Sequence, residues 1–238
     1  MMNNVIEVSH LRVERGGTLV IPGLDVTIAR GSVTGLLGPS GCGKTTLIRC
    51  LAGIQIVQRG QVSVLGEPAG TPVNRARVAY VTQSSSVYPD LTVRQNLDYF
   101  AALSGSNADD VERALGQVGL TDRGGSLTSE LSGGQRTRGS LAAALLADPD
   151  VYLLDEPTVG LDPVLRRDLW NLFRSLAADG RTLLVSSHVM DEAGRCDRVL
   201  LMRDGELIAN ATPDELRLDA GTDDLEQAFL VLAERSAA

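Results

Sequence analysis

A short apolar segment that runs into a glycine-rich loop, residues 32–46 (SVTGLLGPSGCGKTT), constrains the fold more than any other feature. Residues 38–45 have the spacing Gly-x4-Gly-Lys-Thr, in which the glycines let the backbone curl around a phosphate group. The N-terminus of a following helix would favour the same anion. We therefore predict a strand at Ser32–Leu37, a phosphate-binding loop, and a helix that includes Leu47–Ile54.

The loop would supply most contacts to a bound nucleotide. Lys44 is the only lysine among 22 basic residues, and as a compact point charge it would reach the β- and γ-phosphates and take part in catalysis. The Thr45 hydroxyl would hold Mg²⁺, and Thr46 would bind the α-phosphate. The predicted ATP-binding residues of this loop are Gly38, Pro39, Ser40, Gly41, Cys42, Gly43, Lys44, Thr45 and Thr46.

Cys42 allows two interpretations. Its place near the helix N-terminus would favour the thiolate, so that alkylation would block activity and ATP would protect. Alternatively, Cys42 is a tolerated small residue at a variable position of the motif.

Two carboxylates follow a second apolar segment. Val151–Leu154 is a continuous apolar run, as is typical of a strand buried in a parallel sheet, and Asp155 and Glu156 come directly after it. Ligands of parallel sheets lie at the carboxyl ends of the strands. We predict that Asp155 holds Mg²⁺ and that Glu156 is the general base that polarises the attacking water.

The remaining patterns predict an α/β fold: a P-loop NTPase core with a parallel sheet, an N-terminal antiparallel β layer, and an inserted α-helical subdomain. Val5–Val13 and Thr18–Ile28 alternate in polarity as half-buried strands do. Helical spacing dominates residues 91–146, where Ser106 is expected to cap a helix. The predicted domains are an ATP-binding domain, residues 1–218, and a short helical tail, residues 219–238.

Composition and charge argue against several classes of protein. A net charge of −8 argues against broad nucleic-acid binding, so no nucleic-acid partner is expected. The three cysteines show no metal-ligand spacing, which favours free thiols in a reducing compartment. The N-terminus lacks the features of a signal peptide, and no apolar run approaches the roughly 18 residues that span a bilayer.

The pentapeptide LSGGQ, residues 131–135, resembles the signature motif of ATP-binding cassette (ABC) ATPases. Three further motifs occur in that family's order: Gln83 after the strand VAYV matches the Q-loop, residues 158–162 (TVGLD) match the D-loop, and His188 matches the switch histidine. The resemblance covers essentially the whole chain.

The resemblance implies specific roles. In this family two domains pair head to tail around two ATP molecules, so a second copy or a related subunit is expected. Ser132, Gly133, Gly134 and Gln135 would contact the nucleotide of the partner, and Asp162 would bridge the subunits. His188 would hold the γ-phosphate and the attacking water, and Gln83 would sense the γ-phosphate and Mg²⁺.

One position departs from the family pattern. Where an aromatic residue usually stacks on adenine, this chain has Arg15. Arg15 would stack its guanidinium plane on the base, or it is a solvated loop residue.

The segments LDPVLRRDLW and SSHVMDEAGRCDRVLLMRDGELIANATPDEL resemble ATPases of the ABC-2 export type. Such a subunit works with a separate membrane-spanning permease, so the resemblance implies peripheral attachment at the cytoplasmic face of the membrane. Val87, Tyr88 and Leu91 would form a groove for the permease's coupling helix, or this loop packs on the helical subdomain. A soluble ABC ATPase not tied to transport is the alternative function, and an adjacent permease gene would distinguish the two.

Overall fold

The computed structural model describes residues 4–235. The strands are β1 (Asn4–Arg15), β2 (Thr18–Ala29), β3 (Val33–Leu37), β4 (Arg59–Val64), β5 (Glu67–Pro68), β6 (Val78–Val81), β7 (Val151–Asp155), β8 (Thr182–Ser187), β9 (Arg198–Arg203) and β10 (Glu206–Ala211). The helices are α1 (Lys44–Leu51), α2 (Pro72–Arg75), α3 (Val93–Ser104), α4 (Ala108–Gln117), α5 (Gly133–Leu146), α6 (Pro163–Ala178), α7 (Pro213–Ala220) and α8 (Leu225–Arg235), with short 3₁₀ helices η1 (Thr121–Arg123), η2 (Thr128–Glu130) and η3 (Met190–Arg195).

The central sheet has the strand order β10-β9-β3-β8-β7-β6 and is parallel except for the edge strand β10. Every residue of β3, β7 and β8 is buried, which explains the apolar runs VYLL of β7 and LLV of β8. The buried residues of these strands also include polar ones, among them Ser186 and Ser187. Leu37 pairs with Ser187, and Asp155 pairs with Ser186. The carboxyl ends of these three strands therefore meet at one edge of the sheet, where loops far apart in the sequence come together.

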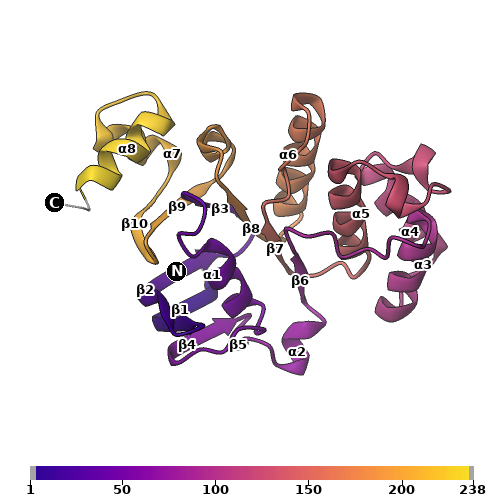
Figure 1. The fold of residues 1–238 in the computed structure, drawn as a ribbon, viewed down its shortest axis with the longest axis horizontal. Coiled ribbons are helices and arrows are strands. Elements are labelled where there is room, and N and C mark those ends of the chain that lie inside the picture. The colour runs from indigo at the N-terminus through magenta and orange to yellow at the C-terminus, as the bar shows by residue number, and fades with distance from the viewer. Residues whose placement is uncertain (1–3, 236–238) are drawn as a thin grey trace.

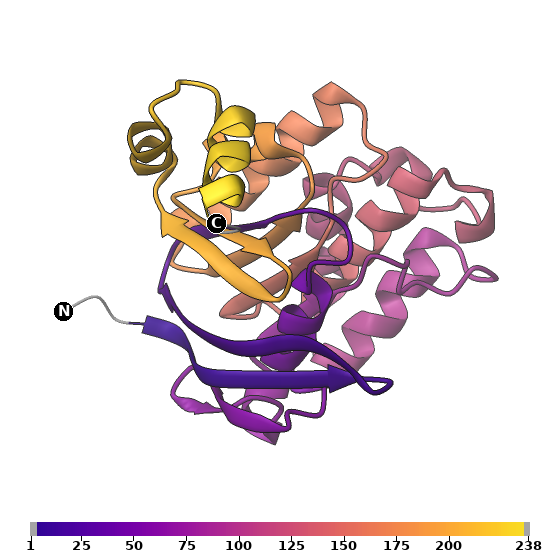
Figure 2. The same cartoon turned by 60° about the vertical axis from the view of Figure 1, so that its left-hand side comes forward.

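Two hydrophobic layers enclose this sheet. Leu36 and Leu153 face one core, which they share with α1 and an antiparallel sheet of order β2-β1-β4-β5. Their neighbours Leu37 and Leu154 face the other core, with α5 and α6. The antiparallel layer lies on one side of the central sheet and α6, α7 and α8 lie on the other (Figures 1 and 2). The predicted α/β fold with an N-terminal antiparallel layer is confirmed.

Helices α3, α4 and α5 form a lobe beside the β6 edge of the sheet (Figure 1). Leu97, Val111, Leu115 and Leu141 are almost fully buried within it. The lobe lies inside the helical block predicted from the sequence. That residues 91–146 form a distinct subdomain, and that residues 219–238 form a separate tail, stay predictions.

Local capping signals explain most helix starts. Thr212 and Glu215 form a capping box at α7, as the spacing in the sequence TPDE indicates, and Ser132 forms one with Gln135 at α5. The prediction for α4 was wrong by one residue: Asn107 is the cap, and its side chain accepts the N–H groups of Asp109 and Asp110. The Ser106 hydroxyl instead donates to the Leu146 carbonyl, 2.7 Å away.

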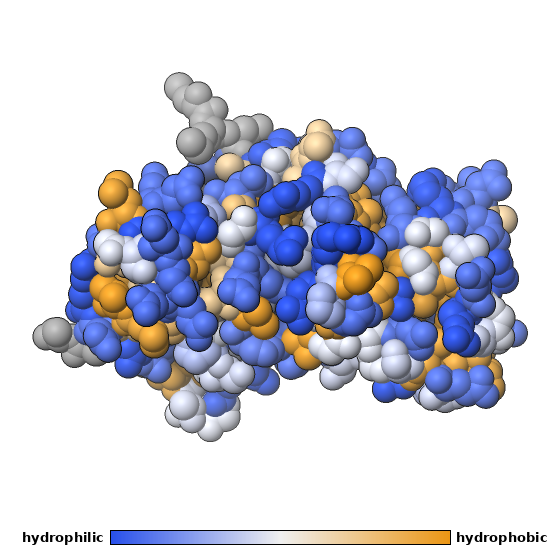
Figure 3. Space-filling model, turned by 90° about the horizontal axis from the view of Figure 1, so that it is seen from above, coloured by the Kyte–Doolittle hydropathy of each residue, from blue (hydrophilic) through white to orange (hydrophobic). Residues whose placement is uncertain are grey.

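Among residues 4–235, no helix is both long and apolar enough to cross a membrane. On the face seen in Figure 3, hydrophobic side chains form small patches between hydrophilic ones.

Candidate functional site

The phosphate loop joins β3 to α1 at the carboxyl edge of the sheet. Gly38 has a φ of +156°, and a Cβ there would lie 2.1 Å from the Met202 carbonyl oxygen. Gly43, with a φ of +111°, is the N-cap of α1. Both positions require glycine, because one has no space for a side chain and the other adopts a backbone conformation that L-residues rarely take.

Lys44 is held inside this loop. Its side chain is 5% exposed, and Nζ donates to the Gly38 and Pro39 carbonyls at 2.7 and 3.0 Å. The same nitrogen lies 3.9 Å from Glu156 Oε1. The phosphate loop thus encloses the Lys44 ammonium group at the N-terminus of α1. An anion bound there would contact both this positive charge and the free backbone N–H groups of the helix.

A cavity of about 550 Å³ opens in front of the loop. Arg15 and Gln83 line it together with Glu156 and the loop residues Ser40, Gly41, Gly43, Lys44, Thr45 and Thr46. The structure therefore brings to one cavity residues that the sequence places in four separate segments. Val20, which the sequence did not single out, also lines this cavity and adds an apolar contact.

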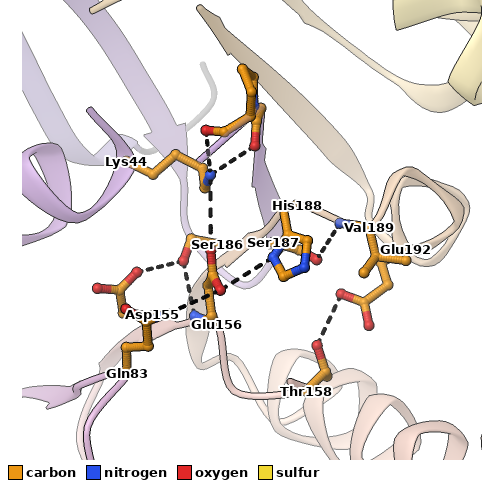
Figure 4. A network of polar contacts seen from close by, with 12 residues as sticks. Lys44, Gln83, Asp155, Glu156, Thr158, Ser186, Ser187, His188, Val189 and Glu192 are labelled. Carbon is orange, nitrogen blue, oxygen red and sulfur yellow. Dashed lines mark hydrogen bonds and ion pairs between the residues drawn. The ribbon is translucent and has the colours of Figure 1, made fainter. Parts of the chain in front are cut away.

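Glu156 is the point where these segments converge (Figure 4). Its carboxylate lies 3.2 Å from His188 Nδ1, 3.4 Å from Gln83 Nε2 and 3.9 Å from Lys44 Nζ. The side chain is 11% exposed, so water reaches it while most of it is shielded. Glu156 also has a φ of +53°, a left-handed conformation that is uncommon for a residue with a side chain.

Asp155, at the end of β7, is 2% exposed. Its Oδ1 accepts the Ser186 hydroxyl at 2.7 Å, whereas Oδ2 is buried and has no hydrogen-bond partner among the described residues. A buried carboxylate oxygen without a partner is unfavourable unless a cation or water satisfies it. Oxygen ligands of this kind suit Mg²⁺, so the residues present fit that ion.

Three signature residues, Ser132, Gly133 and Gly134, line a second cavity of about 460 Å³, and Gln135 is not among the residues that line it. This cavity shares Gln83 and Glu156 with the first. Ser132 caps α5, and Gln135 is tied into the same capping box. The N–H groups of Gly133 and Gly134 belong to the first turn, which has no intrahelical acceptor for them. A Cβ on Gly134 would lie 2.8 Å from Leu161 Cδ2, so a glycine lets this turn approach the D-loop closely.

Asp162 caps the next helix. Its Oδ1 accepts the N–H groups of Val164 and Leu165, each at 3.0 Å. The carboxylate thus fixes the start of α6, and this exposed residue does not line either cavity.

Sequence patterns missed a buried polar contact behind the D-loop. Glu192 in η3 is 1% exposed, and its Oε2 accepts the Thr158 hydroxyl at 3.1 Å (Figure 4). Arg166 Nε lies 3.7 Å from the other carboxylate oxygen. This contact ties the D-loop to the segment that follows His188. The sequence SHVMDEAGR around Glu192 carries no local signal that this carboxylate is buried.

The expectation that the Cys42 thiolate is favoured was wrong. Burial raises the pKa of the Cys42 thiol, and this effect outweighs the opposing influence of the Lys44 charge and of backbone N–H groups. The side chain is 6% exposed because it packs between the phosphate loop and the core around α1.

We accordingly expect the native protein to react slowly with iodoacetamide at pH 7. Cys50 and Cys196 are also buried, and burial raises the pKa of each to about 12, so none of the three thiols is a ready nucleophile. Intact-mass measurement should show little alkylation in buffer, whereas in urea all three cysteines should be alkylated. Rapid, ATP-sensitive alkylation of Cys42 at pH 7 would contradict this prediction.

Known proteins that are similar to this chain include ATP-binding proteins of ABC transporters. The family model described as "ABC transporter" matches residues 21–159. The chain is 36% identical, over 96% of its length, to the probable multidrug ABC transporter ATP-binding protein YbhF of Escherichia coli, of which it spans 41%. It is 41% identical, over 91% of its length, to the Nod factor export ATP-binding protein I of Paraburkholderia xenovorans, of which it spans 73%.

A solved structure described as the ATP-binding subunit of an ABC transporter has the same fold. Its TM-score is 0.86 at 27% identity, and the match covers 96% of this chain and 99% of that one.

Proposed function

The chain belongs to the ABC transporter family, and on that premise we propose that it is the ATP-hydrolysing subunit of a membrane transporter of the export type. One observation carries the proposal: Glu156, Gln83, His188 and Lys44 converge at the mouth of a phosphate loop. A carboxylate beside a phosphate cradle and a histidine can position water for attack on a γ-phosphate.

Each residue of the site has a distinct task in this proposal. The backbone N–H groups of the loop and Lys44 bind the phosphates and stabilise the charge that develops during transfer. Glu156 accepts the proton of the attacking water, and His188 orients that water. Asp155, Thr45 and Gln83 would hold Mg²⁺, which when bound neutralises charge on the phosphates. Arg15, on the cavity wall, would face the base.

The proposed working unit is a dimer. The chain carries one phosphate loop and one signature motif, and Ser132 and Gly133 are exposed at the N-terminus of α5. The positive end of that helix suits the γ-phosphate of an ATP bound by a second subunit. Asp162 is exposed, and its neighbour Leu161 lies close to Gly134 of the signature motif. Asp162 would then face the partner subunit.

We expect the specific ATPase activity of the purified chain to rise with protein concentration. If two subunits form each site, the rate below the dimerisation constant depends on the square of the chain concentration. Steady-state phosphate release at a series of concentrations tests this, with EDTA as the control that removes Mg²⁺. Specific activity that stays constant while the chain remains monomeric would contradict the shared site.

The partner in the membrane is proposed to be a permease that contacts the loop after Gln83. Val87 packs against α5 near Gly139, and Tyr88 packs edge-to-face on Tyr99 with ring centroids 5.4 Å apart, so part of this loop rests on the helical lobe. Tyr88 and Tyr99 nevertheless stay 45% and 44% exposed, which leaves apolar ring surface for a coupling helix. The name of one relative, the Nod factor export ATP-binding protein I, favours export. We propose from the family resemblance that the chain attaches at the cytoplasmic face of the membrane.

A further inference from the structure

Ser186 on β8 is a fully buried polar residue between the two carboxylates of the site. Its hydroxyl donates to Asp155 Oδ1 at 2.7 Å and accepts the backbone N–H of Glu156 at 2.9 Å (Figure 4). A hydroxyl has one hydrogen to donate and can accept as well, so both contacts can form at once. Strand register brings them about, because Ser186 is the direct neighbour of Asp155 across the parallel pair β7 and β8.

The first contact determines how Asp155 presents its carboxylate. With Oδ1 bonded to Ser186, Oδ2 is the oxygen that has no partner within residues 4–235. That oxygen is the one available to a cation or its water. Losing the hydroxyl would free the carboxylate to rotate and would leave two buried oxygens without a protein partner.

The second contact determines the backbone at Glu156. The φ of +53° places this residue in a region that side-chain-bearing residues rarely occupy, and such conformations persist only where the surroundings enforce them. The bond from the Glu156 N–H to Ser186 is one such constraint. The direction of the Glu156 side chain toward His188 depends on this turn.

We propose that Ser186 is a positioning residue that orients Asp155 and Glu156 together for metal binding and water activation. This inference rests on the proposed ATPase function. Ser186 does not line the nucleotide cavity, so it acts through its two neighbours. Replacing a residue that hydrogen-bonds to a metal ligand in this way typically changes metal affinity or activity by about 10- to 100-fold.

The test compares Ser186→Ala and Ser186→Cys with Thr182→Val. Cysteine has the shape of serine with a slightly larger atom and replaces the hydroxyl with a weak donor, so it decides the question even if the alanine variant does not fold. Thr182 is the matched control: it lies on the same strand, is 1% exposed, and its hydroxyl accepts the Gly31 N–H at 3.0 Å, away from the site.

For both Ser186 variants we expect kcat to fall about 10-fold or more and the Mg²⁺ concentration for half-maximal activity to rise. A second readout needs no turnover. Titration with a fluorescent ATP analogue should show unchanged affinity in EDTA but a smaller gain in affinity when Mg²⁺ is added. Thr182→Val should lower only the melting temperature.

The outcomes separate the two proposals. If wild-type protein hydrolyses ATP and the folded Ser186 variants keep its kcat, its Mg²⁺ requirement and its Mg²⁺-dependent gain in nucleotide affinity, Ser186 is only structural and the inference fails. If wild-type protein hydrolyses no ATP, the proposed function fails instead. The Mg²⁺ dependence of nucleotide binding then still decides whether Ser186 orients Asp155.

Discussion

Replacing Glu156 with Gln is expected to lower ATP hydrolysis by about 10²- to 10⁴-fold while ATP still binds, the range typical of losing a general base. The amide has nearly the shape of the carboxylate and can keep hydrogen bonds to Gln83 and His188, but it cannot accept the proton of the attacking water. Because ATP is then not consumed, the ATP-bound dimer should accumulate. Phosphate release measures the first effect, and size-exclusion chromatography with ATP and Mg²⁺ measures the second.

Glu67→Gln is the matched control, since it makes the same change of charge at an exposed position on β5, away from both cavities. It should hydrolyse ATP at the wild-type rate and form no trapped dimer. Undiminished hydrolysis by Glu156→Gln would mean that another group activates the water. Lost hydrolysis together with lost ATP binding would point to Glu156 as a structural residue of the cavity.

Features that depend on a few consecutive residues were predictable. The phosphate loop needs glycines at particular positions of one short segment, so the pattern specifies both its strand and its helix. The same holds for the capping boxes at Ser132 and Thr212, where the cap and its partner are three residues apart. Even here the predicted cap of α4, Ser106, differs from the observed cap, Asn107. Both residue types can cap a helix, and in the structure the Ser106 hydroxyl bonds to the Leu146 carbonyl while Asn107 accepts the N–H of Asp109.

Features that depend on strand order were not predictable from one sequence. Two serines at the end of the apolar strand TLLVSS were the available signal for Ser186, but its partner is 31 residues away. Only the order β3-β8-β7 makes the two meet. The prediction that the Cys42 thiolate is favoured was wrong for a related reason. The position of Cys42 in the motif predicts that it lies near a helix N-terminus, but it does not predict how deeply the core buries the sulfur.

The full width of a helix's buried face was harder still to predict from the sequence. Leu165, Leu169, Leu172, Phe173 and Leu176 have helical spacing, which indicates the buried face of α6. Trp170 lies outside this stripe, next to Leu169, yet it is 1% exposed and packs edge-to-face on Phe173 with ring centroids 5.5 Å apart. The width of a helix's buried face depends on how many neighbours it has, and here α6 packs over the central sheet.

Lys44→Arg should fold normally and lose ATP hydrolysis by about 10²-fold or more, the scale of removing one preorganised group that stabilises transition-state charge. The Lys44 side chain is nearly buried, and its ammonium group fits between the Gly38 and Pro39 carbonyls. A planar guanidinium is broader and needs more acceptors in a fixed fork, so it keeps the charge but does not fit a space shaped for a slender chain.

Lys44→Met separates charge from shape, because it keeps the slender chain and removes the charge. If the geometry of the loop is decisive, both variants lose activity; if charge alone matters, Lys44→Arg retains the wild-type rate, and the argument from shape fails. An independent readout follows from composition, since Lys44 is the only lysine of the chain. Amine acetylation followed by mass spectrometry therefore reports on one side chain, apart from the N-terminus. ATP should slow acetylation of Lys44, because phosphates that bind its Nζ in place of the loop carbonyls would shield the nitrogen from the reagent.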